Sequence, residues 1–152
     1  MLTDVPRLPL LPVKSSTKSA LETAAPTGLG QIEYRLARDA TVRGFRRGQL
    51  SKLDVCDAQP ELLRVATNLG QVTETECPIC EEANLVNVLF AFGPRLPAQG
   101  RALESQTELR SLAKSDDIIF YVVEVCTACR WNHLLRNFTA QTARRRARTG
   151  QA

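Results

Sequence analysis

Two runs of apolar residues dominate the pattern of hydrophobic and polar positions along this chain. Residues 85–92 and residues 118–125 are rich in the β-branched and aromatic side chains that favour strands. We expect the two runs to pair in antiparallel fashion as a β-hairpin. Its far end would carry residues 93–117, with a rigid turn-rich loop at 93–97 and a short helix over residues 104–114.

The clearest helical periodicity lies in residues 31–70. One face of a helix is indicated by four residues at positions i, i+3, i+7 and i+11: Tyr34, Ala37, Thr41 and Phe45. This spacing predicts a helix over residues 31–47 with its arginines on the opposite face. A capping box begun by Ser51 predicts a second, short helix, and Pro60 suits the first position of a third. These residues therefore predict a helical hairpin or a three-helix cap.

Four cysteines stand in two Cys-x-x-Cys pairs that adjoin the apolar runs. The first pair, Cys77 and Cys80, precedes one run, and the second pair, Cys126 and Cys129, follows the other. Antiparallel pairing of the runs would bring the four thiols together, and two such pairs are typical of a tetrahedral Zn²⁺ site. Buried cysteines, a redox pair or an iron–sulfur cluster are the alternatives. With four thiolates the site is closed, so we expect one structural Zn²⁺.

Three other residues bear on this site. His133, the single histidine, follows Cys129 closely enough to be an alternative ligand, although a position beside the ligands or at the surface suits it better. Trp131, the single tryptophan, could shield the thiolates from water or stack on a base. Cys56 has no cysteine or histidine at ligand spacing and is interpreted as a structural thiol.

Composition and charge limit the class of protein. The odd cysteine count and the lack of an apolar leader or of a long apolar span favour a cytoplasmic protein with reduced thiols. The net charge of +4 is unevenly distributed. Seven basic and five acidic residues fall in 31–70, six and nine in 71–138, and four and none in 139–152. The acidic character of the cysteine segment moves any expected phosphate contact away from the metal site.

The expected fold class is α+β. A helical cap, residues 31–70, would pack on a zinc-ribbon module, residues 71–138, between flexible termini. Residues 1–30 are punctuated by prolines and predict a disordered leader. Residues 139–152 form an arginine-rich basic tail whose composition suits a helix formed on binding, or a solubilising end.

These motifs resemble a small actinobacterial family of unknown function. The resemblance covers residues 31–138 and leaves both ends of the chain outside it. It implies a cytoplasmic bacterial protein with a zinc ribbon, and it carries over no catalytic residue. The matching segments are residues 34–37, 54–58, 60–64, 77–80, 92–97 and 121–133.

The sequence favours a non-enzymatic accessory protein that docks on the transcription machinery, with RNA polymerase as the preferred partner. The alternatives are a ribosome- or RNA-associated protein and a general protein–protein interaction module. An enzyme is disfavoured because neither an open metal position nor a phosphate-binding or nucleophile motif is visible. No membrane or small-molecule partner is expected. The residues expected to contact a partner or nucleic acid are Arg35, Arg43, Arg46, Arg130, Trp131, Arg144, Arg145, Arg146 and Arg148.

Overall fold

The two apolar runs are neighbouring antiparallel strands, as their pattern predicts. In the computed structural model, which describes residues 30–149, β3 (Asn84–Phe92) pairs with β5 (Ile119–Val125). The register runs from Val86 opposite Val125 to Phe92 opposite Ile119. The two strand ends that adjoin the cysteine pairs therefore lie side by side.

The sheet is larger than the predicted hairpin. Among the described residues it has six strands, in the order β1-β6-β5-β3-β2, with β4 paired to β3, and all pairings are antiparallel. Four strands are not predicted by the hydrophobic pattern: β1 (Gln31–Glu33), β2 (Gln71–Glu76), β4 (Arg101–Ala102) and β6 (Asn132–Thr139).

The helices agree with the prediction in number between residues 31 and 70 but not at every boundary. The helix predicted over 31–47 begins later, because residues 31–33 pair with β6 as a strand. The predicted capping box is confirmed, since Ser51 and Asp54 exchange both of its hydrogen bonds. The helices are α2 (Arg35–Arg46), α3 (Lys52–Val55), α4 (Pro60–Leu69), α5 (Gln106–Leu112) and α6 (Ala140–Thr149).

Alternation along the strands gives the sheet two covered faces. Val88 and Val123 belong to one buried cluster, which α4 covers with Leu62 and Ala66. The neighbouring residues on the same strands point the other way. They pack in a second cluster with residues of α5 and α6, among them Leu89, Phe120, Val122, Ala140 and Ala143. A third cluster at the cysteine end contains Cys77, Cys126 and Trp131.

The basic tail is an integral helix of the fold, which corrects the expectation of a flexible end. Ala140, Thr142 and Ala143 of α6 are buried, and Arg144 donates to the Ala113 carbonyl at 2.6 Å and to Asp116 at 2.6 Å. The predicted leader, apart from Gly30, lies outside the described residues.

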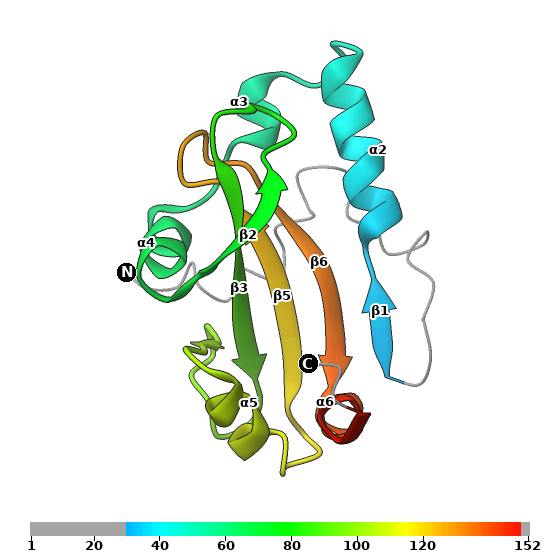
Figure 1. Ribbon diagram of the computed structural model, residues 1–152, viewed down its shortest axis with the longest axis vertical. Coiled ribbons are helices and arrows are strands. Elements are labelled where there is room, and N and C mark those ends of the chain that lie inside the picture. Colours follow the sequence, from blue (N-terminus) through cyan, green and yellow to red (C-terminus); the bar gives the residue numbers. More distant parts are fainter. Residues whose placement is uncertain (1–29, 150–152) are drawn as a thin grey trace.

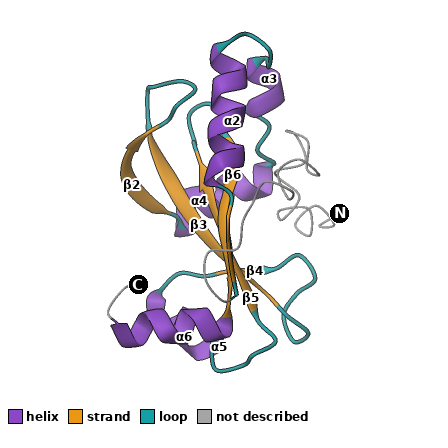
Figure 2. Cartoon of the chain, turned by 90° about the vertical axis from the view of Figure 1, so that its right-hand side faces the viewer, coloured by secondary structure: helices purple, strands orange, loops and turns teal. Residues whose placement is uncertain are grey.

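Figures 1 and 2 show how these elements are arranged along the molecule. Helices α2 and α3 lie toward one end of the long axis, and α5 and α6 lie at the other end (Figure 1). The view turned by 90° shows the same separation (Figure 2). Most of helix α2 is therefore distant from helix α6 along the long axis.

Candidate metal centre

Each cysteine pair lies at the tip of a β-hairpin. Cys77 and Cys80 lie between β2 and β3, and the hairpin is closed where the Cys77 N–H donates to the Ala83 carbonyl at 2.8 Å. Cys126 and Cys129 lie between β5 and β6. There the Cys126 N–H donates to the Trp131 carbonyl, also at 2.8 Å. Because β3 and β5 are neighbours, the two tips meet at one end of the sheet.

The two tips have the same backbone conformation. The residue after the second cysteine of each pair has a positive φ, 57° at Glu81 and 74° at Arg130. Its N–H donates to the carbonyl of the first cysteine of that pair, at 3.1 Å for Glu81 to Cys77 and 3.0 Å for Arg130 to Cys126. Left-handed backbone at a non-glycine residue is uncommon. Its repetition gives both turns one shape, with both sulfurs of a pair on the same side.

The four sulfurs gather as a metal site requires. The Sγ atoms of Cys77, Cys80, Cys126 and Cys129 all lie within 4.8 Å of one another. Two cross-hairpin pairs are closer: Cys77 to Cys129 at 3.6 Å and Cys80 to Cys126 at 3.7 Å. Zn–S bonds of about 2.3 Å in a tetrahedron place sulfurs roughly 3.8 Å apart, so these thiols fit one Zn²⁺. The metal-ligand set predicted from the sequence is thus brought together.

The surroundings of the thiols act in opposite directions on their ionisation. Burial raises the pKa of Cys77 to about 11 and raises the pKa of Cys129 as well. Burial also opposes ionisation of Cys80, but hydrogen bonds from the Glu82 backbone and from neighbouring thiols outweigh it and lower the pKa of Cys80. A cation is the group that would favour thiolates at the buried positions, because it supplies the positive charge that they lack.

Cys56 lies beside the cluster, a neighbourhood that its spacing in the sequence did not indicate. It follows α3, and its Sγ is 3.6 Å from Sγ of Cys129. The four-cysteine group does not include it, since only the other four sulfurs all lie within 4.8 Å of one another. A fifth thiol therefore lies next to one corner of the site.

Trp131 is a core residue, which corrects its assignment to a contact surface. Its side chain is fully buried in the cluster that contains Cys77 and Cys126. The indole Nε1 donates to Glu124 Oε1 at 2.9 Å, and Arg38 Nε from α2 donates to the same oxygen at 2.6 Å. Trp131 thus shields the cysteine end of the sheet, and its ring is not exposed for base stacking.

His133 is also buried and lies outside the four-cysteine group, so the alternative that it lies at the surface is wrong. It stands opposite Glu124 in the β5–β6 register, and its ring stacks on Trp131 at a centroid distance of 5.8 Å. Its Nδ1 lies 2.8 Å from the Leu134 carbonyl oxygen. His133 therefore supports Trp131 from the side of β6.

The arginines predicted to contact a partner are distributed over three regions. Arg35, Arg43 and Arg46 are exposed on α2, and Arg145 and Arg148 are exposed on α6. The remaining three have partners within the fold. Arg130 donates to the Ala58 carbonyl at 2.6 Å and 3.1 Å, Arg144 binds Ala113 and Asp116, and Arg146 donates to Gln31.

Over residues 30–149, fold and site together define a mixed α and β protein built on a six-stranded antiparallel sheet, with a four-cysteine cluster at one end. None of the described helices has the length and apolar character that a bilayer crossing requires. Residues 27–152 match DUF5318, a family of unknown function, and the chain belongs to this family. Because the match includes residues 139–152, the expectation that the basic tail lies outside the family is wrong.

The relatives are mycobacterial. The chain is 35% identical over 114 residues to the uncharacterized protein Rv0049 of Mycobacterium tuberculosis, covering 74% of this chain and 83% of the relative. Identity and coverage are the same for the uncharacterized protein Mb0050 of Mycobacterium bovis. No solved structure matches the chain significantly. Function must therefore be argued from the geometry of this molecule.

Proposed function

We propose that this protein is a non-enzymatic, zinc-stabilised accessory protein of the gene-expression machinery. The observation that carries the proposal is the cluster of four sulfurs at the tips of two neighbouring hairpins. A single Zn²⁺ held by four thiolates has no position left for water or substrate, so its role is structural. In this proposal the metal end of the sheet is a zinc ribbon extended by further strands.

The metal would fix the α2–α3 end of the molecule to the sheet. Arg130, which follows the second cysteine pair, donates to the Ala58 carbonyl in the loop between α3 and α4. Asn132, at the start of β6, donates to Asp57 in the same loop at 3.0 Å. Metal binding and the position of this loop are therefore coupled through short polar contacts.

The exposed face of α2 is the surface proposed to meet the partner. Arg35, Arg43 and Arg46 are exposed there, and Leu36 on the same helix is 68% exposed. Exposed arginines with an apolar side chain among them suit an acidic protein surface. RNA polymerase is proposed as the partner by analogy with the zinc ribbons found in transcription assemblies.

The metal is tested first, by measuring zinc in the purified full-length chain with elemental mass spectrometry. One equivalent of zinc per chain is expected, and its loss on mutation of Cys80 or Cys129 would assign the ligands. A chain that is folded and metal-free after purification without chelators would contradict the proposal.

The partner is tested by affinity purification of the tagged chain at mild salt, followed by mass spectrometry. Enrichment of RNA polymerase subunits is expected. The chain with Arg35, Arg43 and Arg46 changed to Gln should lose them, whereas the chain with Arg145 and Arg148 changed to Gln should retain them. Co-sedimentation with ribosomal particles instead would favour the ribosomal alternative. If the chain associates with neither RNA polymerase nor ribosomal particles, the proposed docking is refuted.

A further inference from the structure

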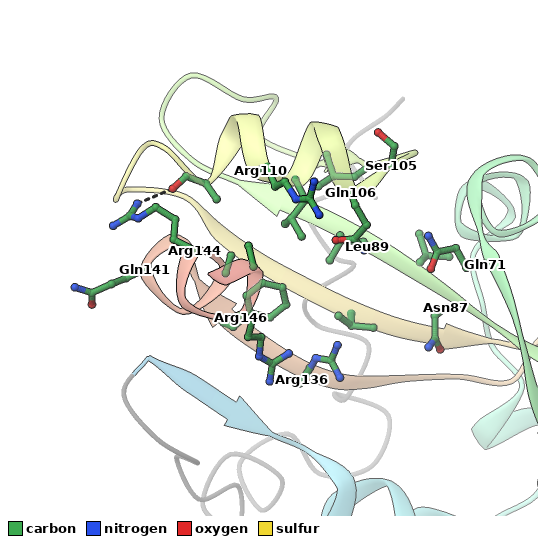
Figure 3. Close-up of a pocket in the computed structure, with 18 of the residues that line it drawn as sticks. Gln71, Asn87, Leu89, Ser105, Gln106, Arg110, Arg136, Gln141, Arg144 and Arg146 are labelled. Atoms are coloured by element: carbon green, nitrogen blue, oxygen red, sulfur yellow. Dashed lines mark hydrogen bonds between the residues drawn. The ribbon is translucent and has the colours of Figure 1, made fainter. Parts of the chain in front are cut away.

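A pocket opens on the sheet face that α5 and α6 partly cover, away from the cysteine end. Its volume is about 670 Å³, within the ~300–1,000 Å³ typical of small-molecule sites. Strands β3, β5 and β6 supply its floor, and the two short helices supply its walls (Figure 3). We call this the arginine pocket, after Arg110, Arg136, Arg144, Arg146 and Arg148, which line it.

The floor of the arginine pocket is apolar. Leu89, Val122 and Phe138 come from three adjacent strands, and Val122 stands opposite both Leu89 and Arg136 in the register. Leu103 and Leu109 extend the apolar lining on the α5 side. A surface of this kind binds the hydrocarbon or aromatic part of a ligand.

The charge of the lining is entirely of one sign. Five arginines line the arginine pocket, and no Asp or Glu is among the lining residues in the part of the chain that the structure describes. Asp116 binds Arg144 from outside the lining set. A concave site with one sign of charge and low-dielectric walls concentrates counter-ions of the opposite sign.

Arg136 and Arg146 are the two arginines placed on the floor. Their guanidinium carbons lie 5.9 Å and 5.5 Å from the centre of the Phe138 ring. Figure 3 shows the two side chains next to each other at this end of the pocket. Arg146 donates to Gln31, whereas the buried Nε of Arg136 has no hydrogen-bond partner among the described residues. A buried donor of this kind costs free energy until an acceptor reaches it.

The ionisation of Arg136 agrees with this geometry. Burial lowers the pKa of Arg136, and the positive charges of Arg146 and Arg35 lower it further, although Glu33 acts in the opposite direction. An anion beside Arg136 and Arg146 would offset both the repulsion and the lost hydration. Glu33, which stands opposite Arg136 in the β1–β6 register, supplies part of this compensation already.

We propose that the arginine pocket binds a small amphiphilic organic anion, whose carboxylate or phosphate head meets Arg136 and Arg146 and whose apolar body lies on Leu89, Val122 and Phe138. The planar guanidinium group presents paired donors that suit either head. The enclosed volume and apolar floor favour a small molecule over a nucleic-acid backbone, which is polar and continuous. This proposal does not rest on the proposed partner, and the two can fail separately.

The test uses the full-length chain as purified without chelators, and four probes at concentrations below those at which they self-associate. Decanoate and decyl phosphate carry the two candidate heads on one apolar body, decanol lacks the charge, and inorganic phosphate lacks the apolar body. Saturable one-to-one binding of decanoate or decyl phosphate is expected in calorimetry. Decanol and inorganic phosphate should each bind at least about tenfold more weakly, because each loses one half of the recognition.

Two variants and one control locate the site. Arg136→Gln should lower the affinity for the favoured probe at least about tenfold, because a charge-assisted hydrogen bond is lost. Arg43→Gln, which makes the same charge change on exposed α2, should leave binding unchanged. Ala147→Glu places a negative charge at an exposed position of α6 that lines the pocket. It should lower the affinity for decanoate and decyl phosphate and leave the affinity for decanol unchanged. In nuclear magnetic resonance spectra, the Arg136 side-chain N–H signal should shift on titration.

Several results would overturn the proposal. Equal affinity for decanol and decanoate would show that the pocket does not recognise the anionic head. Equal affinity of Arg136→Gln and Arg43→Gln for the favoured probe would show that Arg136 is not part of the binding site. Absence of saturable binding by both amphiphiles would also refute it. If an oligonucleotide shifted the Arg136 signal and the amphiphiles failed to compete, the arginines would belong to a nucleic-acid surface instead.

Discussion

Trp131 and Arg38 donate to the same carboxylate oxygen, Oε1 of Glu124, at 2.9 Å and 2.6 Å. The Glu124 side chain is 6% exposed and that of Arg38 is 17% exposed. One buried carboxylate thus joins helix α2, strand β5 and the indole that covers the cysteine end. Burial would lower the pKa of Arg38, but Glu124 and Asp39 together outweigh it and raise that pKa.

Glu124→Gln should destabilise the fold. The substitution keeps an acceptor for Trp131 but leaves the largely buried Arg38 charge with Asp39 alone as its counter-ion, at 3.2 Å and half-exposed, at a cost of about 1–3 kcal/mol. The free energy of unfolding is measured by denaturant titration. The matched control is Glu61→Gln, which breaks an exposed pair with Arg64 at 3.5 Å and should cost almost nothing. Equal effects of the two substitutions would contradict a structural role for Glu124.

The four-thiolate assignment predicts different outcomes for different cysteines. Cys80→Ser or Cys129→Ser should release zinc and unfold the cysteine end, because the free energy of metal binding is also free energy of folding. Cys56→Ser should retain one equivalent of zinc, although its sulfur is only 3.6 Å from that of Cys129. Zinc is measured by elemental analysis of each purified variant. If the single substitution Cys56→Ser released the zinc, Cys56 would have to be counted among the ligands.

Removal of zinc with a chelator should expose Trp131. Its indole is fully buried beside Cys77 and Cys126, so its fluorescence should shift to longer wavelength as the hairpin tips separate. As the single tryptophan of the chain, it gives a signal that reports on this end alone. Re-addition of zinc should reverse the shift. An unchanged spectrum with complete zinc loss would show that the hydrophobic cluster holds without metal.

Truncation after Phe138 should destabilise the protein and not merely remove charge. It removes the buried residues Ala140 and Ala143 of α6 and the bond from Arg144 to Ala113, which together contribute about 2 kcal/mol or more. Thermal unfolding measures the effect. The double substitution Arg145→Gln and Arg148→Gln leaves these contacts intact and should preserve the melting temperature. It is therefore the cleaner variant for any measurement of nucleic-acid binding against salt.

Alanine substitutions at Gly70 and Gly48 should destabilise the fold for two different reasons, a steric clash and an unfavourable backbone conformation. At Gly70 an added Cβ would lie 2.1 Å from Cγ1 of Val86 and 2.4 Å from the Ala66 carbonyl oxygen, so Gly70→Ala should cost about 1–3 kcal/mol. At Gly48 nothing lies within 4 Å, and only its φ of 75° opposes alanine, at about 1 kcal/mol. Comparison of the melting curves of the two variants tests the packing of α4 on β3. A smaller loss of stability in Gly70→Ala than in Gly48→Ala would contradict this packing.

The four-cysteine cluster was predictable because its determinants are local. Each cysteine pair adjoins a strong strand signal, and antiparallel pairing of residues 85–92 with 118–125 leaves only one end at which the pairs can meet. The capping box at Ser51 and the proline at the first turn of α4 are equally local, and both are confirmed. Such features depend on the spacing of a few residues and on backbone preferences.

The strand β6 was not predictable in this way. Its sequence lacks regular alternation, and the register shift between Val122 and Val123 turns Leu134 toward one face and Arg136 toward the other. The strand exists because the turn at Arg130 brings the chain back onto β5. Its pairing then buries His133 and Trp131, for which the sequence alone left open both a place beside the cysteines and an exposed one.

By itself, the sequence determined the four-cysteine site, the two central strands and the helices that cap them, since each is encoded over short distances. Only the tertiary structure decided that Cys56 lies beside the cluster, that the arginine-rich end packs as α6, and that Arg136 and Arg146 meet in one pocket. Those relationships join residues from 31 to 146 through pairing and burial. Long-range contacts of this kind depend on how whole elements pack, which no local pattern of polar and apolar residues specifies.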